Sequence, residues 1–193
     1  RGRMSESSRE RLIQIADRLF YEHGFHAIGI DRVISEVGVT KTTFYNHFES
    51  KDDLILAVLD ARDQREISEW METMRSRAGG DPRRQLLVLF DIMHEWYTQE
   101  DFRGCMFINA AAQFPAPNDP IHVAAGKHGE HLYGQLREIA IKAGAAEPDL
   151  LTSQLMLVVS GALVTQHSAK SQEAAAAARA MVDLLVDRHV PGV

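Results

Sequence analysis

One short stretch of the sequence is rich in hydrogen-bond donors and contains no acidic side chain. Its exposed positions are expected to be Lys41, Thr42, Thr43, Asn46 and His47. An ammonium group, hydroxyls, an amide and an imidazole can donate hydrogen bonds to phosphate oxygens, and several of them can also pair with base edges. This stretch therefore has the chemistry of a surface that faces a nucleic acid.

Two short amphipathic helices are expected to position these donors. Apolar residues recur at helical spacing over 30–37 and stop at Gly38, and Thr40 is a suitable N-cap for a second helix over about 41–47. Two helices joined by a short turn with a glycine form a helix-turn-helix, whose second helix presents its N-terminal residues to the major groove of DNA. Spacing alone also fits an ordinary helical protein, so that alternative stays open at this point.

The remaining sequence also predicts helices. A capping box at 7–10 begins a helix that ends near Gly24, and Ser50 begins a long helix. Two last helices are expected over about 148–167 and 171–189. Apolar residues recur every three or four positions, and no long alternation typical of strands appears, so the sequence predicts an all-α fold.

Composition limits the class of protein. The chain has 193 residues, of which 45% are hydrophobic and 25% charged, as in an ordinary globular protein with one large or two small domains. Its one cysteine, Cys105, cannot form an intramolecular disulfide, which excludes a disulfide-stapled secreted domain. No nucleophile–base motif, phosphate-binding loop or acidic metal cluster is present, so we expect neither an enzyme nor a bound cofactor or metal.

The formal net charge of −6 would disfavour a nucleic acid as partner, but most of the negative charge lies outside the N-terminal part of the chain. Residues 1–53 have a net charge of −1, and residues 54–193 have a net charge of −5. Near the start, four arginines outnumber the acids and predict a positive arm that is available to phosphates. They are Arg1, Arg3, Arg9 and Arg11.

We expect a cytoplasmic protein that does not enter a membrane. The first eleven residues are polar and charged and lack the apolar core of a signal peptide. The most apolar stretch, Leu155–Val164, is interrupted by Ser160 and Gly161 and is shorter than the roughly 20 residues that a membrane span needs.

The segment from Gly24 to Leu54 resembles the DNA-binding domain of TetR-family bacterial transcriptional regulators. The resemblance is carried by Gly-Val-Thr at 38–40, Phe-Tyr-x-His-Phe at 44–48 and Ser-Lys-x-x-Leu at 50–54. It implies a three-helix DNA-binding domain over 1–50, joined to a larger helical domain over 51–193 that binds an effector and dimerises. The implied function is a ligand-responsive regulator, a repressor, that binds a palindromic operator in double-stranded DNA as a homodimer.

The resemblance also implies individual roles. Lys41, Thr42, Thr43 and Asn46 match positions that face the groove, and Thr40, Tyr45, His47 and Lys51 match positions that contact phosphates. The chain departs from the family pattern just before the second helix. There it has Ile28 and Gly29 in place of a threonine or serine, so we expect the side-chain contact usual at this point to be reduced to a backbone amide or lost.

For the C-terminal two-thirds, the sequence offers candidates rather than a motif. Aromatic and polar residues suited to an effector pocket are Phe90, His94, Tyr97, Phe107, Asn109 and His131, although each also fits an ordinary core. Cys105 is a candidate thiol sensor or an inert buried side chain. The last two helices, about 148–189, are implied to form the homodimer interface.

An alternative from a different class is a small helical metal-binding protein or enzyme. It would use His122, His128 and His131, three of the nine histidines, which lie within ten residues. No tight metal motif such as His-Glu-x-x-His accompanies them.

Overall fold

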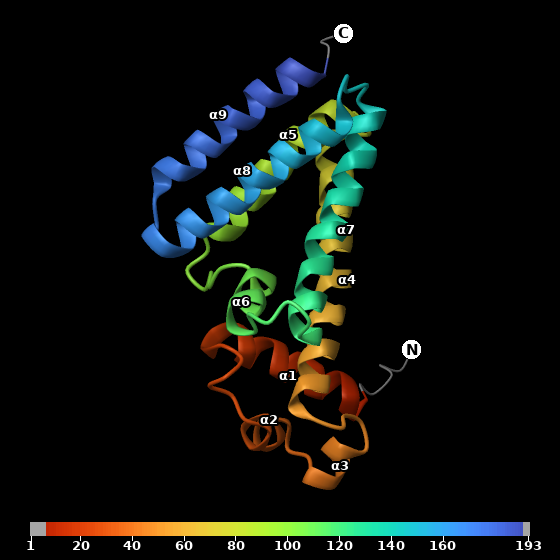
Figure 1. Cartoon of the computed structure of the whole chain (residues 1–193), viewed down its shortest axis with the longest axis vertical. Coiled ribbons are helices and arrows are strands. Elements are labelled where there is room, and N and C mark those ends of the chain that lie inside the picture. Colours follow the sequence, from red (N-terminus) through yellow and green to blue (C-terminus); the bar gives the residue numbers. More distant parts are fainter. Residues whose placement is uncertain (1–6, 191–193) are drawn as a thin grey trace. The chain divides into compact units, whose positions relative to one another are not determined.

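The computed structural model describes residues 7–190, and within that range every regular element is a helix. The all-α prediction is confirmed. Arg1 and Arg3 of the predicted positive arm lie outside the described residues. The helices are α1 (Ser8–His23), α2 (Ile30–Val37), α3 (Lys41–Tyr45), α4 (Lys51–Ala78), α5 (Pro82–Tyr97), α6 (Met106–Gln113), α7 (Pro120–Lys142), α8 (Pro148–Ala169) and α9 (Gln172–His189) (Figure 1).

The chain divides into two compact units. The first comprises Arg1–Arg65 and Met106–His128, and the second comprises Glu66–Cys105 and Gly129–Val193. Helices α4 and α7 therefore contribute to both, and α6 belongs with the N-terminal helices. The functional domains expected over 1–50 and 51–193 stay predictions, since compact units describe packing alone.

Aromatic side chains fill the core of the first unit, where α1, α2 and α3 pack against one another. Phe44 is fully buried, and its ring lies 5.6 Å from that of Phe48. The rings of Phe20 and Phe25 lie 5.3 Å apart. Fully burying one such side chain contributes roughly 1.5–3 kcal/mol, so these rings carry much of the stability of the three short helices.

Helix α6 is attached to the turn that follows α1. The backbone N–H of Phe25 donates to the side-chain oxygen of Gln113 at 2.9 Å, and the His26 ring lies 3.0 Å from the Gln113 carbonyl oxygen. The turn itself requires a glycine, because Gly24 has φ +84° and a Cβ there would lie 3.3 Å from the Gln113 side chain.

A mostly buried ion pair joins α1 to α4. Arg62 donates to Asp17 at 2.9 Å, and its guanidinium also lies 4.5 Å from the centre of the Tyr21 ring. The side chains of Arg62 and Asp17 are only 10% and 17% exposed. Arg65 supplies a second, more exposed contact to the same carboxylate. Removing two charges from water costs free energy, so a pair this deep needs close contacts and further hydrogen bonds to offset that cost.

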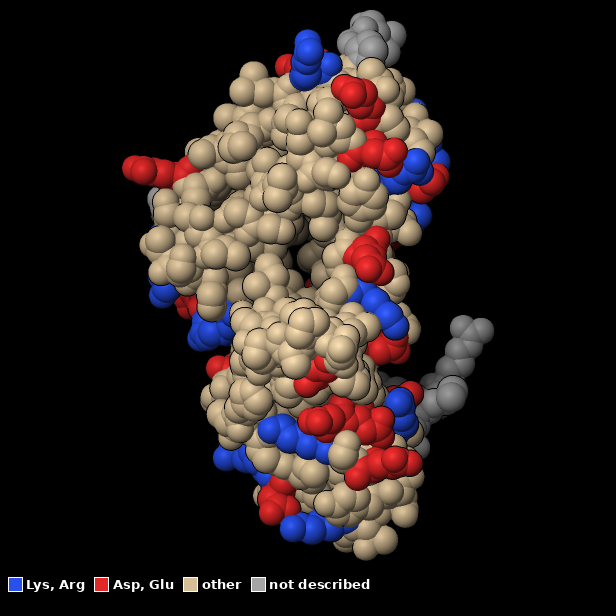
Figure 2. Space-filling view, viewed as in Figure 1, with Lys and Arg blue, Asp and Glu red and all other residues tan. Residues whose placement is uncertain are grey.

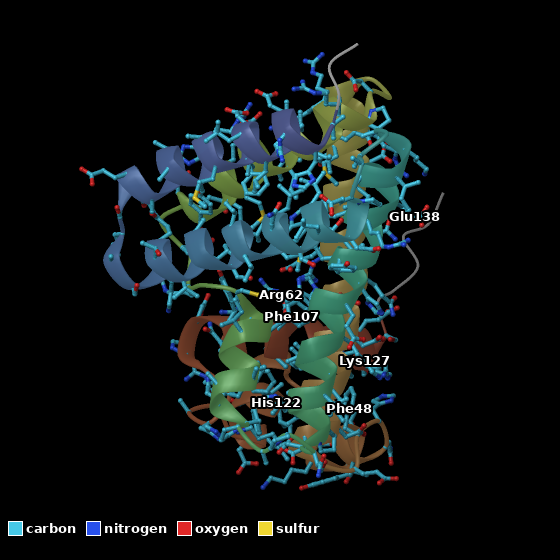
Figure 3. All side chains as sticks on the ribbon, turned by 45° about the horizontal axis from the view of Figure 1, so that its top comes forward. Phe48, Arg62, Phe107, His122, Lys127 and Glu138 are labelled. Carbon is cyan, nitrogen blue, oxygen red and sulfur yellow. The ribbon has the colours of Figure 1, made fainter. Side chains whose placement is uncertain are left out.

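A second buried polar contact joins α4 to α7. The His128 ring lies 2.7 Å from the Asp63 carboxylate and stacks on Phe107 of α6 at 3.8 Å. Figure 3 labels Arg62 on α4, Phe107 on α6 and His122 on α7, which are three helices of the first unit. The contacts of His128 thus connect α4, α6 and α7 within the first unit.

In the second unit, α5, α8 and α9 pack together, and α8 and α9 form an antiparallel hairpin (Figure 1). Among the described residues, α8 alone is long and apolar enough to cross a membrane by length and composition. This corrects the expectation that its apolar stretch is too short. Core helices of soluble proteins can have the same length and composition, and 39% of the most apolar 18-residue segment of α8 is buried. These two properties therefore do not by themselves make α8 a membrane helix.

Replacing Asp17 by asparagine is expected to lower the free energy of unfolding by about 3 kcal/mol, because the mostly buried ion pair with Arg62 loses its carboxylate. Urea unfolding followed by circular dichroism measures the loss. The control is Glu72→Gln, which removes a carboxylate from an exposed pair with Arg75 and is expected to cost less than about 0.5 kcal/mol. Equal losses in the two variants would contradict the importance of the buried pair.

Candidate nucleic-acid interface

The turn between α2 and α3 has the backbone that a helix-turn-helix needs. Gly38 ends α2 in the left-handed conformation, with φ +75°. Thr40 is the N-cap of α3, and its hydroxyl accepts a hydrogen bond from the N–H of Thr43 at 3.1 Å. Gly29 is the N-cap of α2 and makes no side-chain capping bond, as expected from the missing hydroxyl.

Helix α3 is shorter than predicted. It ends at Tyr45, and Asn46 is its C-cap, so the expected extension to residue 47 is wrong by two residues. The N–H of His47 donates to the carbonyl of Phe44, which closes a tight turn instead of continuing the helix. This turn brings the ring of Phe48 back into the core beside Phe44.

The predicted contact residues gather on one exposed surface around α3. Thr43 is half-buried, and Lys51 lies at the start of α4, where burial lowers its pKa. Tyr45 is 56% exposed although its ring packs edge-on against Phe44. The exposed members are Thr40, Lys41, Thr42, Tyr45, Asn46 and His47.

An acid from outside α3 lies on the same surface. The Lys41 ammonium lies 2.8 Å from the carboxylate of Asp31, which belongs to the first turn of α2. The hydrogen bond to Asp31 raises the pKa of Lys41 and keeps it charged. The absence of acids holds for α3 itself, but Asp31 and Lys41 are ten positions apart in the sequence, and only the packing of α2 against α3 brings them together.

The predicted effector residues fall into three places. Phe90, His94 and Tyr97 border one cavity of ≈ 220 Å³ between α5 and α9 in the second unit, together with Arg179. Burial raises the pKa of Tyr97 and keeps its hydroxyl protonated. Phe107 and Asn109 lie on α6 in the first unit, and His131 lies on the α7 segment of the second unit with an exposed side chain. Each unit thus holds only part of the set.

The histidines of the alternative metal site make other contacts. His122 lies 2.8 Å from the carbonyl oxygen of Phe114, and His128 is buried against Asp63. His131 belongs to the second unit. Over residues 7–190, no group of three or more His, Cys, Asp or Glu side chains is placed to hold a metal ion. Cys105, the candidate thiol sensor, is buried and directly precedes α6.

This geometry has counterparts among known proteins. The sequence profile described as "Bacterial regulatory proteins, tetR family" matches residues 12–58. The crystal structure of SCO4454, a TetR-family transcriptional regulator from Streptomyces coelicolor, is 30% identical, covers 95% of this chain and 96% of its own, and superposes with a TM-score of 0.85. The chain belongs to the TetR family.

Other relatives of this TetR-family chain match over shorter segments. HTH-type transcriptional activator FasR of Mycolicibacterium smegmatis is 29% identical over 103 residues, which are 53% of this chain and 46% of FasR. An uncharacterized HTH-type transcriptional regulator of Bacillus subtilis, YerO, is 33% identical over 79 residues, or 41% of this chain and 27% of YerO. The chain thus matches less than half the length of these relatives.

Replacing Thr40 by alanine in this TetR-family chain is expected to lower the free energy of unfolding by about 1 kcal/mol, because α3 loses its side-chain cap. Thr40→Ser keeps the hydroxyl and should recover most of that loss. Chemical unfolding measures both, with Thr42→Ala as the control because Thr42 is exposed and caps nothing in the described structure. A Thr40→Ala protein as stable as the parent would show that the cap does not hold α3.

Proposed function

We propose that this chain is a DNA-binding transcriptional regulator that binds a palindromic operator as a homodimer. The observation that carries this proposal is the exposed donor surface of α3, set at the end of a helix-turn-helix. In that motif the second helix enters the major groove with its N-terminal residues on base edges. Lys41, Thr42, Thr43 and Asn46 are the proposed base-reading residues, and Thr40, Tyr45, His47 and Lys51 the proposed phosphate contacts.

A second copy of the chain is the proposed partner of the α8–α9 hairpin. A groove of ≈ 490 Å³ lies on this face, and its lining includes Gly161 and Ala177. Leu157, which lines the groove, is 73% exposed, and Leu184 of α9 is 70% exposed. Figure 2 shows that the visible face over these two helices is almost free of charged side chains. Contiguous exposed apolar patches are typical of sites where proteins bind one another.

The same face offers both projections and hollows, which suits pairing with itself. In a two-fold interface a residue on one copy meets a different residue of the same patch on the other. Leucines that project beside a glycine and an alanine can fill the hollow of the partner and bring the helices close. Such a dimer presents two copies of α3 to half-sites roughly 34–36 Å apart, and its two-fold symmetry leads to a palindromic operator.

The proposed control is repression that a small-molecule effector releases. The cavity bordered by Phe90, His94 and Tyr97 is the proposed location, because aromatic walls with a few polar groups are typical of ligand sites. An effector acts only through a difference in its affinity for two conformations. The name of the FasR relative describes an activator, so a reporter gene beside the selected operator should decide the direction for this chain.

Selection of bound duplexes from a random pool is expected to enrich a palindromic sequence. Affinity for the winner should fall steeply with salt, because phosphate contacts release counterions. Lys41→Ala should weaken binding roughly tenfold. Tyr45→Phe should weaken it roughly twofold to tenfold, since one hydrogen bond is lost. Lys142→Ala, an exposed change on α7 of the second unit, is the control. A pool without enrichment, or equal losses in all three variants, would contradict the proposal.

Replacing Leu157 by glutamate is expected to convert the dimer to monomers without unfolding them, because the side chain is exposed in one copy and would place a charge inside the proposed interface. Sedimentation velocity at micromolar concentration measures the change. Leu150→Glu is the matched control on the same helix, since Leu150 is 44% exposed and does not border the groove. If the parent chain sediments as a monomer, the proposed dimer is wrong.

A further inference from the structure

The acid beside Lys41 lies where an interface with DNA would form. Lys41 is the first residue of α3, and Asp31 lies in the first turn of α2. Their side chains are 67% and 75% exposed, so both charged groups project into solvent beside each other. A carboxylate 2.8 Å from the ammonium lies within the same footprint as the ammonium itself.

Two neighbouring cations are paired as well. Arg32, the other cation of α2 and α3, lies 3.4 Å from Glu36. Arg18 of α1 also contacts Glu36. In Figure 2, positive and negative side chains alternate over the part of the molecule that holds α1, α2 and α3. Helices α2 and α3 therefore carry two cations and two acids and add no net positive charge to the proposed interface.

The equal numbers of cations and acids affect how tightly the surface binds DNA of different sequences. Affinity for arbitrary sequence comes almost entirely from cations that neutralise phosphates. A carboxylate gains nothing from a phosphate, which offers no proton and carries the same charge. In the major groove, however, the amino group at N4 of cytosine is a donor that aspartate can accept from, while lysine pairs with O6 and N7 of guanine.

We propose that Asp31 is a specificity-determining residue of this surface. On DNA of arbitrary sequence it holds the Lys41 ammonium away from phosphates, so binding is weak. On the operator the pair separates, Lys41 donates to a guanine edge, and the Asp31 carboxylate accepts from the N4 amino group of a nearby cytosine. This inference rests on the proposed function, because it concerns how the same surface selects its DNA.

Asp31→Asn tests the inference on two DNA duplexes. One has a random sequence, and the other has the operator sequence that the selection enriches. Removing the carboxylate frees Lys41 for phosphates. Binding to the random duplex at about 0.1 M salt should become roughly fivefold to tenfold tighter, and its salt dependence should steepen by about 0.9 in log–log slope. The ratio of operator to random affinity should fall by at least the same factor. A new selection with the variant should lose a cytosine preference that the parent shows in each half-site.

Asp149→Asn is the matched control. Asp149 also lies in the first turn of a helix, is 65% exposed and forms an ion pair with an arginine, Arg137, but it belongs to the second unit. It removes the same charge and should leave the random-duplex affinity within twofold of the parent. In a Lys41→Ala background, Asp31→Asn should gain less than twofold, since the cation that it releases is gone.

The outcomes separate this inference from the proposed function. A parent chain that binds neither duplex overturns the function and the inference with it. If the parent binds the winner but Asp31→Asn and Asp149→Asn have equal effects on the random duplex, the function stands and the role of Asp31 is wrong. A full gain in the Lys41→Ala background, or an unchanged cytosine preference, also overturns it. Thermal unfolding checks that the variants fold.

Discussion

The helix at the centre of the proposed interface is too short to be stable alone. Helix α3 has five residues, and forming the first turn of a helix costs more conformational entropy than its hydrogen bonds return. Its stability must therefore come from its surroundings. Phe44 anchors it in the core, Thr40 caps its start, and the turn at Asn46 and His47 returns the chain to the core at Phe48. The exposed face is free for contacts because the buried face does the anchoring.

That dependence extends to the rest of the first unit. The core that anchors α3 contains Phe20 and Phe25, and Phe25 is itself held by Gln113 at the end of α6. Helix α4 is pinned to α1 through Arg62 and Asp17 and to α7 through Asp63 and His128. Charges inside a protein are costly unless they are paired, so these contacts favour one arrangement of the helices over neighbouring ones. A surface that reads DNA needs such a defined arrangement, because groove contacts depend on ångström-scale placement.

In the second unit, small side chains shape the exposed face of α8 and α9. Alanines and glycines on α8 and α9 leave hollows beside projecting leucines, and much of this apolar face is unburied in one copy. Within the chain, α9 buries the apolar side chains of Val182 and Val186, and a partly exposed ion pair between Arg179 and Asp91 joins it to α5. Helix α9 thus has apolar side chains buried within the chain and further apolar side chains that are exposed in one copy, such as Leu184.

The sequence by itself determined the helical class, the caps at Ser7 and Thr40, the turn at Gly38 and the donor set on α3. These features depend on neighbours within a few residues, and local backbone preferences are readable from local sequence. The end of α3 was misplaced because the turn at Asn46 follows from the need to bury Phe48. The pairing of Lys41 with Asp31, the attachment of α6 to the turn after α1, and the scatter of the expected effector residues were decided by tertiary structure alone. Each depends on which side chains of different helices come into contact. The spacing of residues along the sequence does not show which of them lie close together in space.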